Sequence, residues 1–276
     1  MRIWFLGFLT FFLAFPNIAN AHIEFTLLAP QSDFLTSKDT VWVQLQCLSK
    51  IKVSVGSKTI VCPGPGGVKS INVPLKLGKN QISVQGRQDF KVLKVFRTYS
   101  LDWSHADERY QSLQILLARI APPKNYDLKK NVTRAEMAYV FDRISFYKTP
   151  DTRFYAIKDI NEKTPYYSSI KRVVESGWLG IDDQNQFYPD KKLTRIEMLA
   201  AILRYSDMRL VSVGPPVPFK DISLQHWGYP VALTALVHNI ISGGPLLEPD
   251  QYITRMELLT TLLRLPEMTI VLDPWK

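Results

Sequence analysis

The second half of the chain repeats one four-residue motif three times: Thr133-Arg134-Ala135-Glu136, Thr194-Arg195-Ile196-Glu197 and Thr254-Arg255-Met256-Glu257. The copies lie 61 and 60 residues apart, and self-similarity at a fixed period is the signature of a repeat architecture. An apolar, helix-like run follows each motif: Met137 to Ile144, Met198 to Tyr205, and Leu258 to Leu265. The sequence therefore predicts three related units, each with a helix that begins at the motif.

The Thr and Glu of each motif predict the start of that helix. A Thr at the N-cap and a Glu three residues later form a capping box, which satisfies two backbone donors and stabilises a helix by ~1 kcal/mol. We therefore assign the helix caps to the pairs Thr133 and Glu136, Thr194 and Glu197, and Thr254 and Glu257. The Thr and Glu need no ligand to account for them.

The residues upstream of the last two motifs repeat as well. Lys-Asp-Ile occurs at Lys158-Asp159-Ile160 and at Lys220-Asp221-Ile222, followed in each unit by a second helical stretch, a glycine turn and a Pro-Asp pair. The glycines of these turns are Gly180 in one unit and Gly243 with Gly244 in the other. Each unit is predicted to be a helix, an irregular loop and a helix.

These motifs resemble the S-layer homology repeat, whose pattern includes an aromatic-x-Asp start, a His-Trp helix opening and the Thr-Arg-Ala-Glu motif. The last unit keeps Asp221, His226-Trp227 and Thr254-Arg255-x-Glu257, whereas the first unit is degenerate upstream of Thr133. We expect an immunoglobulin-like β-sandwich before these repeats and the following organisation: a signal peptide at 1–21, the β-sandwich at 22–100, repeat 1 at 101–146, repeat 2 at 147–206, and repeat 3 with a C-terminal tail at 207–276.

The resemblance implies an all-α spindle of three repeats with pseudo-threefold symmetry. It also implies that the repeats bind a cell-wall glycan, either an acidic or pyruvylated secondary polymer or peptidoglycan. The glycan-binding candidates that follow are Arg134, Arg195, Arg255, Asp159, Asp221, Trp227, Gly243 and Gly244.

Each of these candidates has a structural alternative. An Arg in the first turn of a helix faces the positive end of the helix dipole, so its triple use indicates recruitment for an anion or a pairing with an acid of the next repeat. Trp227 can stack on a sugar ring or fill a helix interface. Asp159 and Asp221 can accept sugar hydroxyls or cap a turn, and Gly243 and Gly244 can serve the turn alone.

The first half of the chain has a β pattern. Seven short alternating or β-branched runs are separated by Gly, Pro, Asn or Lys: Ile23 to Leu28, Thr40 to Leu48, Ile51 to Val55, Thr59 to Cys62, Ser70 to Leu77, Gln81 to Gln85 and Phe90 to Thr98. Glycine turns at residues 55–58 and 77–80 predict two hairpins. The stretch resembles the immunoglobulin-like modules of exported bacterial proteins through Leu27 to Pro30, Val53 to Gly56, and Leu75 to Ile82.

The chain has two cysteines, Cys47 and Cys62, which lie 15 residues apart. In an oxidising compartment we expect them to form a disulfide, and the alternative is a pair of buried thiols.

The first 21 residues have the pattern of a secretory signal peptide. Arg2 precedes an apolar run from Ile3 to Phe15, which is shorter than the ~20 residues of a membrane span, and Ala19-Asn20-Ala21 suits a signal peptidase. We expect an exported protein, located in the cell wall, S-layer or periplasm, with no transmembrane segment after signal cleavage.

Charge divides the chain at the expected boundary. Residues 22–100 carry 11 Lys and Arg against 4 Asp and Glu, whereas residues 101–276 carry 22 against 21. The β half is therefore basic and the repeat half nearly neutral.

The sequence carries no pattern of an enzyme. It has no nucleophile triad, phosphate loop or nucleotide fingerprint, and two Cys and four His leave little for a metal site. We expect no catalytic residues, metal, cofactor or nucleic-acid partner. The expected function is envelope anchoring through the repeats, with the β module as spacer or partner-binding surface and another envelope protein as partner; the alternative is a protein-interaction subunit of an envelope complex with little glycan affinity.

Overall fold

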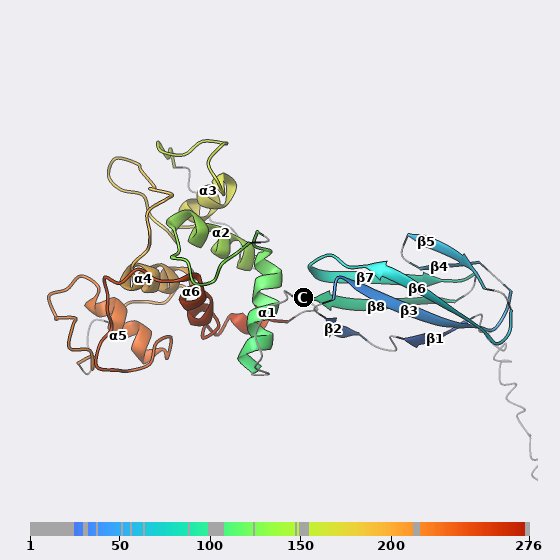
Figure 1. Cartoon of the computed structure of the whole chain (residues 1–276). Helices are drawn as coiled ribbons and strands as arrows, with labels where there is room; N and C mark the ends of the chain where they lie inside the picture. The colour runs from blue at the N-terminus through green and yellow to red at the C-terminus, as the bar shows by residue number, and fades with distance from the viewer. Residues whose placement is uncertain are drawn as a thin grey trace, which may run out of the picture. The chain divides into compact units, whose positions relative to one another are not determined.

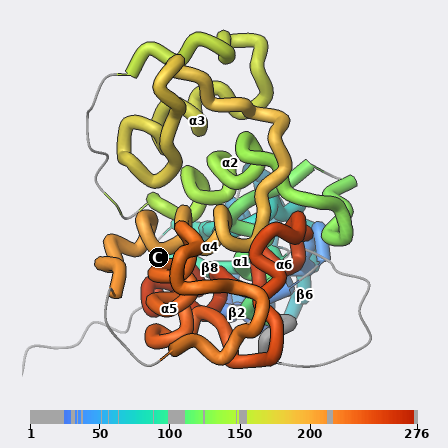
Figure 2. Tube along the Cα trace, turned by 90° about the vertical axis from the view of Figure 1, so that its left-hand side faces the viewer, coloured from blue at the N-terminus to red at the C-terminus, as the bar shows by residue number. Residues whose placement is uncertain are grey.

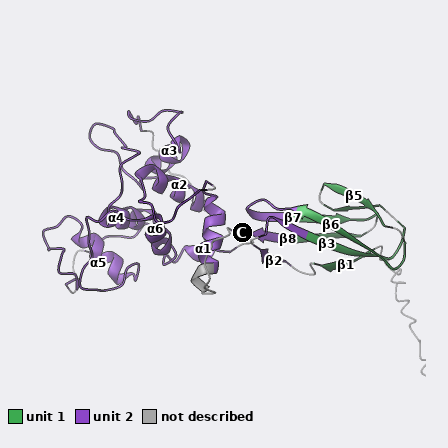
Figure 3. Cartoon of the chain, viewed as in Figure 1, with its two compact units in different colours: residues 1–32, 42–73, 81–93 green, residues 33–41, 74–80, 94–276 purple. Residues whose placement is uncertain are grey.

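A computed structural model describes most of the chain after residue 24. The described residues are 25–29, 33–36, 38–50, 52–55, 57–62, 64–87, 89–98, 108–123, 125–146, 148, 155–211 and 216–273. The signal peptide expected at 1–21 lies outside them. The chain divides into two compact units, residues 1–32, 42–73 and 81–93, and residues 33–41, 74–80 and 94–276 (Figure 3). The predicted domain boundaries stay a prediction.

Strands fill the described part of the chain before residue 99 (Figure 1). They are β1 (Phe25–Ala29), β2 (Phe34–Thr36), β3 (Thr40–Cys47), β4 (Lys52–Val55), β5 (Lys58–Val61), β6 (Gly67–Pro74), β7 (Gly78–Gln85) and β8 (Phe90–Arg97). Their order is β1-β3-β6 in one sheet and β2-β8-β7-β4-β5 in the other.

The two predicted hairpins have different outcomes. β4 pairs antiparallel with β5 so that Val55 faces Lys58, which confirms the hairpin at 55–58. The hairpin at 77–80 is wrong, because β6 and β7 belong to different sheets. Gly78 has a φ of 84° and begins β7, while the Asn80 side chain holds the preceding turn through hydrogen bonds with the Lys76 backbone. The short strand β2, which pairs in parallel with β8, has no counterpart among the predicted strands.

Cys47 and Cys62 form a disulfide. Cys47 ends β3, Cys62 follows β5, and both residues are fully buried. The bond links a strand of the three-stranded sheet to the end of the β4–β5 hairpin in the other sheet.

Helices dominate the chain after residue 107. They are α1 (Glu108–Ile120), α2 (Arg134–Ile144), α3 (Tyr167–Glu175), α4 (Arg195–Tyr205), α5 (Tyr229–Val237), α6 (Arg255–Leu262) and α7 (Met268–Val271). α3 packs on α2 and α5 packs on α4, so the first helix of an expected repeat covers the last helix of the repeat before it (Figure 2). No described helix is both long and apolar enough to cross a membrane.

The expectation that this half is all-α is wrong, because β-bridges join the repeats. Three isolated antiparallel bridges pair Asn131 with Thr254, Thr133 with Lys192, and Thr194 with Tyr252. Between them, Val132, Leu193 and Ile253 close a ring of backbone hydrogen bonds. Val132 N donates to Ile253 O, Ile253 N to Leu193 O and Leu193 N to Val132 O, at N···O distances of 3.0, 3.1 and 3.0 Å.

The largest described apolar cluster includes residues of every helix from α1 to α7. Val132, Leu193 and Ile253 are fully buried in it together with side chains of α2, α4 and α6. Buried backbone donors and acceptors must be paired. The ring therefore pairs the backbone N–H and C=O groups of these three residues, which are buried but lie outside the helices.

We predict that the disulfide stabilises the first unit. Replacing Cys47 and Cys62 together by Ala should lower the free energy of unfolding by about 3 kcal/mol, because a 15-residue loop closed in the unfolded chain would be released. Urea unfolding with and without reductant measures this loss. The double variant should unfold identically in both conditions, and an unchanged unfolding midpoint relative to the oxidised wild type would contradict the prediction.

Candidate functional site

The three motif helices begin with the same cap. Thr133, Thr194 and Thr254 are the N-cap residues of α2, α4 and α6, and in each helix the Thr hydroxyl accepts from the backbone N–H of the Glu at the third helical position. The carboxylate of that Glu accepts from the Thr backbone N–H in return. All three Thr–Glu pairs are thus complete capping boxes.

Each motif also binds the loop of another repeat through its backbone. The N–H groups of the first two helical residues, which have no acceptor inside the helix, donate to carbonyl groups of that loop. The N···O distances are 2.9 to 3.0 Å for Arg134 to Lys191, Ala135 to Pro189, Arg195 to Gln251, Ile196 to Pro249, Arg255 to Lys130 and Met256 to Leu128. The helix N-termini at all three junctions are therefore occupied by protein.

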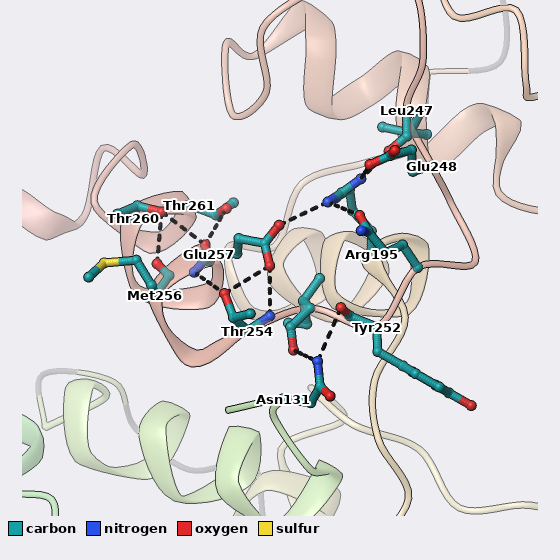
Figure 4. Close-up of polar contacts among 12 residues, drawn as sticks. Asn131, Arg195, Leu247, Glu248, Tyr252, Thr254, Met256, Glu257, Thr260 and Thr261 are labelled. Atoms are coloured by element: carbon teal, nitrogen blue, oxygen red, sulfur yellow. Dashed lines mark hydrogen bonds and ion pairs between the residues drawn. The ribbon is translucent and has the colours of Figure 1, made fainter. Parts of the chain in front are cut away.

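The Arg195 side chain lies between the loop of repeat 3 and α6 (Figure 4). Its guanidinium donates to Leu247 O at 2.6 Å, to the Glu248 carboxylate at 2.9 Å and to the Glu257 carboxylate at 2.8 Å. Burial lowers the pKa of Arg195, but the hydrogen bonds to Glu248 and Glu257 outweigh it and the net pKa is raised. Arg195 is neutralised by acids of the neighbouring repeat.

Arg255 makes the corresponding pairing with α2. Its guanidinium donates to both carboxylate oxygens of Glu136 and to Asp127 O, and it lies 4.3 Å from the centre of the Tyr126 ring. The side chains of Arg255 and Glu136 are only 13% and 14% exposed. The hydrogen bond to Glu136 raises the pKa of Arg255, so this guanidinium is also neutralised.

Arg134 differs from the other two motif arginines. It donates to Phe187 O and to Gly180 O, both at 2.6 Å, and covers the Phe187 ring, but it has no ion pair with a carboxylate of a described residue. Burial lowers the pKa of Arg134, and the nearby Arg204 lowers it further against the opposing effect of Glu197 and Asp159. At the junction between α2 and repeat 2, Glu197 and Asp159 therefore act on Arg134 without a direct ion pair among the described residues.

Asp159 and Asp221 hold the loops that the arginines contact. The Asp159 carboxylate accepts from Phe187 N at 2.8 Å and Tyr188 N at 2.6 Å. Asp221 accepts in the same way from Leu247 N and Glu248 N. Tyr188 and Glu248 have left-handed backbone, with φ of 55° and 54°, so each carboxylate stabilises a strained turn.

The remaining sequence candidates lie apart from these contacts. Trp227 is 58% exposed, and its ring stacks on His226 at a centroid distance of 5.8 Å just before α5. Gly243 and Gly244 do not have left-handed backbone, whereas Gly177 after α3 and Asn239 after α5 do, with φ of 76° and 57°. The turn that follows these helices therefore depends on Gly177 and Asn239.

A pocket of about 240 Å³ lies where α4, α6 and the segment after α5 meet. We call it the Arg264 pocket; it is lined by Arg195, Met198, Ile240, Ile241, Ser242, Glu257, Thr260, Thr261 and Arg264. Arg264 donates to Ser242 Oγ at 3.1 Å and has no ion pair with a described carboxylate. Since a guanidinium has five N–H donors, Arg264 retains donors for an anion.

The four-residue motif does not include Arg264, although the sequence contains a signal for it. Arg143, Arg204 and Arg264 repeat at the same spacing of 61 and 60 residues as the motif arginines, each nine positions further along the chain. Arg143 and Arg204 lie in the last turn of α2 and α4, and Arg264 lies just after the C-cap of α6, so the motif at the helix start does not include them.

The capping glutamates should contribute unequally to stability. Glu136→Ala should lower the free energy of unfolding by about 3 kcal/mol, because it leaves Arg255 buried without a counter-charge. Glu197→Ala should cost about 1 kcal/mol, because its partner Lys191 is 52% exposed. Urea unfolding measures both values. The double variant Glu136→Ala/Arg255→Ala should be less destabilised than the sum of its single variants, and equal losses for Glu136→Ala and Glu197→Ala would show that burial of the Arg255 pair has no effect on stability.

Acid should remove the contribution of Glu257. Burial raises the pKa of Glu257, but hydrogen bonds from Thr254 and Arg195 outweigh it, so the folded-state pKa lies below the ordinary value of 4.5. The stabilisation is thus complete above pH 4.5 and is lost as the pH falls through the folded-state pKa. Melting temperature between pH 6 and pH 3 should fall less steeply for Glu257→Gln than for the wild type; parallel curves would exclude this linkage.

The chain is similar to a known domain family and to a known surface-layer protein. The family model described as the S-layer homology domain matches residues 156–199 and 218–259, which contain Asp159, Arg195, Asp221 and Arg255. A surface-layer 125 kDa protein of Lysinibacillus sphaericus is 29% identical over 140 residues, which cover 48% of this chain and 12% of that protein. Both findings point to a structural, non-catalytic protein with a role at the cell envelope. The chain therefore contains two stretches that match the S-layer homology domain, at residues 156–199 and 218–259.

Proposed function

We propose that the repeats anchor the chain by binding a carboxylate-bearing cell-wall polymer, and that the Arg264 pocket is the point of attachment. The observation that carries this proposal is the Arg264 guanidinium, which faces a pocket and lacks a carboxylate partner among the described residues. A planar guanidinium binds a carboxylate through two parallel hydrogen bonds, which suits an acidic or pyruvylated sugar.

The other lining residues support a sugar in this pocket. Thr260 and Thr261 donate their hydroxyl protons to the carbonyl groups of Met256 and Glu257, so their oxygens remain as acceptors for sugar hydroxyls (Figure 4). The partly exposed Ile241 supplies an apolar surface for the C–H face of a ring, and the buried Met198 and Ile240 pack beside it in the lining. A binding site with an apolar surface and a few placed polar groups is typical for small ligands.

The motif arginines have a supporting role in this proposal. Arg195 lines the Arg264 pocket and is held in place by Glu248 and Glu257, so it forms a fixed part of the pocket wall. At the α2 junction, Arg134 has no direct ion pair among the described residues and supports a second, weaker attachment point. In this proposal the β-rich unit acts as a spacer or as a surface that binds another envelope protein.

Co-sedimentation with cell-wall sacculi tests the proposal. The full chain should be retained on sacculi that carry their attached polymer and released when acid extraction has removed that polymer. Equal retention on both preparations would identify peptidoglycan as the ligand, and no retention on either would refute wall binding.

Arg264→Gln should weaken retention at least about tenfold, because it removes a charge-assisted pair of hydrogen bonds worth about 1.5 to 3 kcal/mol. Arg209→Gln is the matched control, since Arg209 is exposed and lies outside the pocket. Both variants should melt at the wild-type temperature. Equal retention of the two variants would exclude the Arg264 pocket as the attachment point.

A further inference from the structure

Apart from the Arg264 pocket, a cleft lies on the outer face of strands β4, β5 and β7 of the five-stranded sheet. It is lined by Lys50, Lys52, Ser54, Val61, Gln85, Gly86 and Arg87 and has a volume of about 680 Å³. Strand alternation explains the lining. Val53 and Val55 are buried on the inner face, so Lys52 and Ser54 between them project outward.

The pairing of the strands brings these side chains together. Val61 of β5 lies opposite Lys52, and Gln85 of β7 lies opposite Ser54. Cross-strand partners share a face of the sheet, so the cleft runs across three adjacent strands. Lys50 before β4 and Arg87 after β7 extend the same surface.

No described residue neutralises the positive charge of the cleft. No acidic residue lines the cleft, and neither the ammonium groups of Lys50 and Lys52 nor the Arg87 guanidinium has a partner among the described residues. Residues 42–73 and 81–93, which belong to the first unit, contain six Lys and Arg but one acidic residue, Asp89. Three like charges gathered in one concave surface raise the local concentration of anions.

The lining also restricts the kind of anion. The described residues of the lining include no aromatic side chain, although single-stranded nucleic acids are held mainly by stacking on such rings. Among the described lining residues Val61 is the one large apolar side chain, whereas a membrane-binding surface needs an extended apolar face. The Ser54 hydroxyl and the Gln85 amide lie between the cations, where they can bind sugar hydroxyls.

We propose that this cleft binds a carboxylate-bearing polysaccharide, which gives the β-rich unit a wall contact of its own. The inference rests on the proposed function only for the class of ligand. The cations would bind the carboxylates of consecutive sugars, and Ser54 and Gln85 would bind the hydroxyl groups between them.

Binding of polygalacturonate to the full chain tests this site. The variant Lys50→Gln/Lys52→Gln/Arg87→Gln should bind about tenfold more weakly, as three solvent-exposed charge pairs of roughly 0.5 kcal/mol each are lost. The matched control is Lys38→Gln/Lys69→Gln/Lys91→Gln, which removes the same charge at exposed positions outside the cleft and should bind within about twofold of the wild type. Calorimetry measures both, with neutral dextran as the uncharged polymer.

Equal weakening by both triple variants would show an effect of net charge and overturn the proposal. Unchanged binding of polygalacturonate by the cleft variant would also overturn it. So would a cleft variant that loses binding to phosphatidylglycerol vesicles but still binds polygalacturonate. Arg264→Gln in the same assay separates the two sites. Weaker binding only in the cleft variant refutes the Arg264 pocket and supports the cleft, and weaker binding only in Arg264→Gln does the reverse.

Discussion

Three backbone hydrogen bonds between Val132, Leu193 and Ile253 determine how the repeats fit together. Each residue donates to one neighbour and accepts from the other, so the ring closes only when all three segments are present. The partners lie about 60 and 120 residues apart in the sequence, and bringing them together has an entropic cost that grows slowly with separation. The shared core around the ring compensates for this cost, since the three residues are fully buried within it.

The four-residue motif follows directly from the ring. In each repeat, one residue separates the buried ring member from the motif arginine, and that residue is the N-cap Thr. The Thr and Glu close the helix start, the backbone N–H of the Arg binds the next loop, and the Arg side chain reaches further into the same loop. An Arg at a helix N-terminus is unfavourable towards the helix dipole. Glu136 compensates for it at Arg255, and Glu248 and Glu257 do so at Arg195, which explains a local choice that otherwise conflicts with helix electrostatics.

Local signals make part of this structure predictable. A capping box lies within four residues, so the Thr–Glu pairs and the helices after them can be inferred from spacing alone. The bridges cannot, because each involves one residue pair and leaves no alternating pattern, and for that reason the sequence of the second half predicts only helices. The strand β2 is not predicted either, because its three residues are too few to show an alternating pattern. Asp159 and Asp221 are recognisable as cap or ligand candidates, but their acceptor role depends on left-handed residues 29 and 27 positions away, which no local pattern indicates.

The arginines of the repeats differ in whether they form an ion pair with an acid of a neighbouring repeat. Where a guanidinium is bound to acids of a neighbouring repeat, as in Arg195 and Arg255, removing it leaves a partly buried carboxylate without its partner, and binding and stability change together. Arg264 has a different environment: its described acceptors are a carbonyl and the Ser242 hydroxyl, both neutral. A ligand carboxylate would supply the counter-charge that the fold does not. Arg255 and Arg264 thus differ in environment: Arg255 joins two repeats through Glu136, whereas the acceptors of Arg264 among the described residues are neutral. The recurrence of an arginine in a motif is therefore as consistent with a contact between repeats as with a ligand.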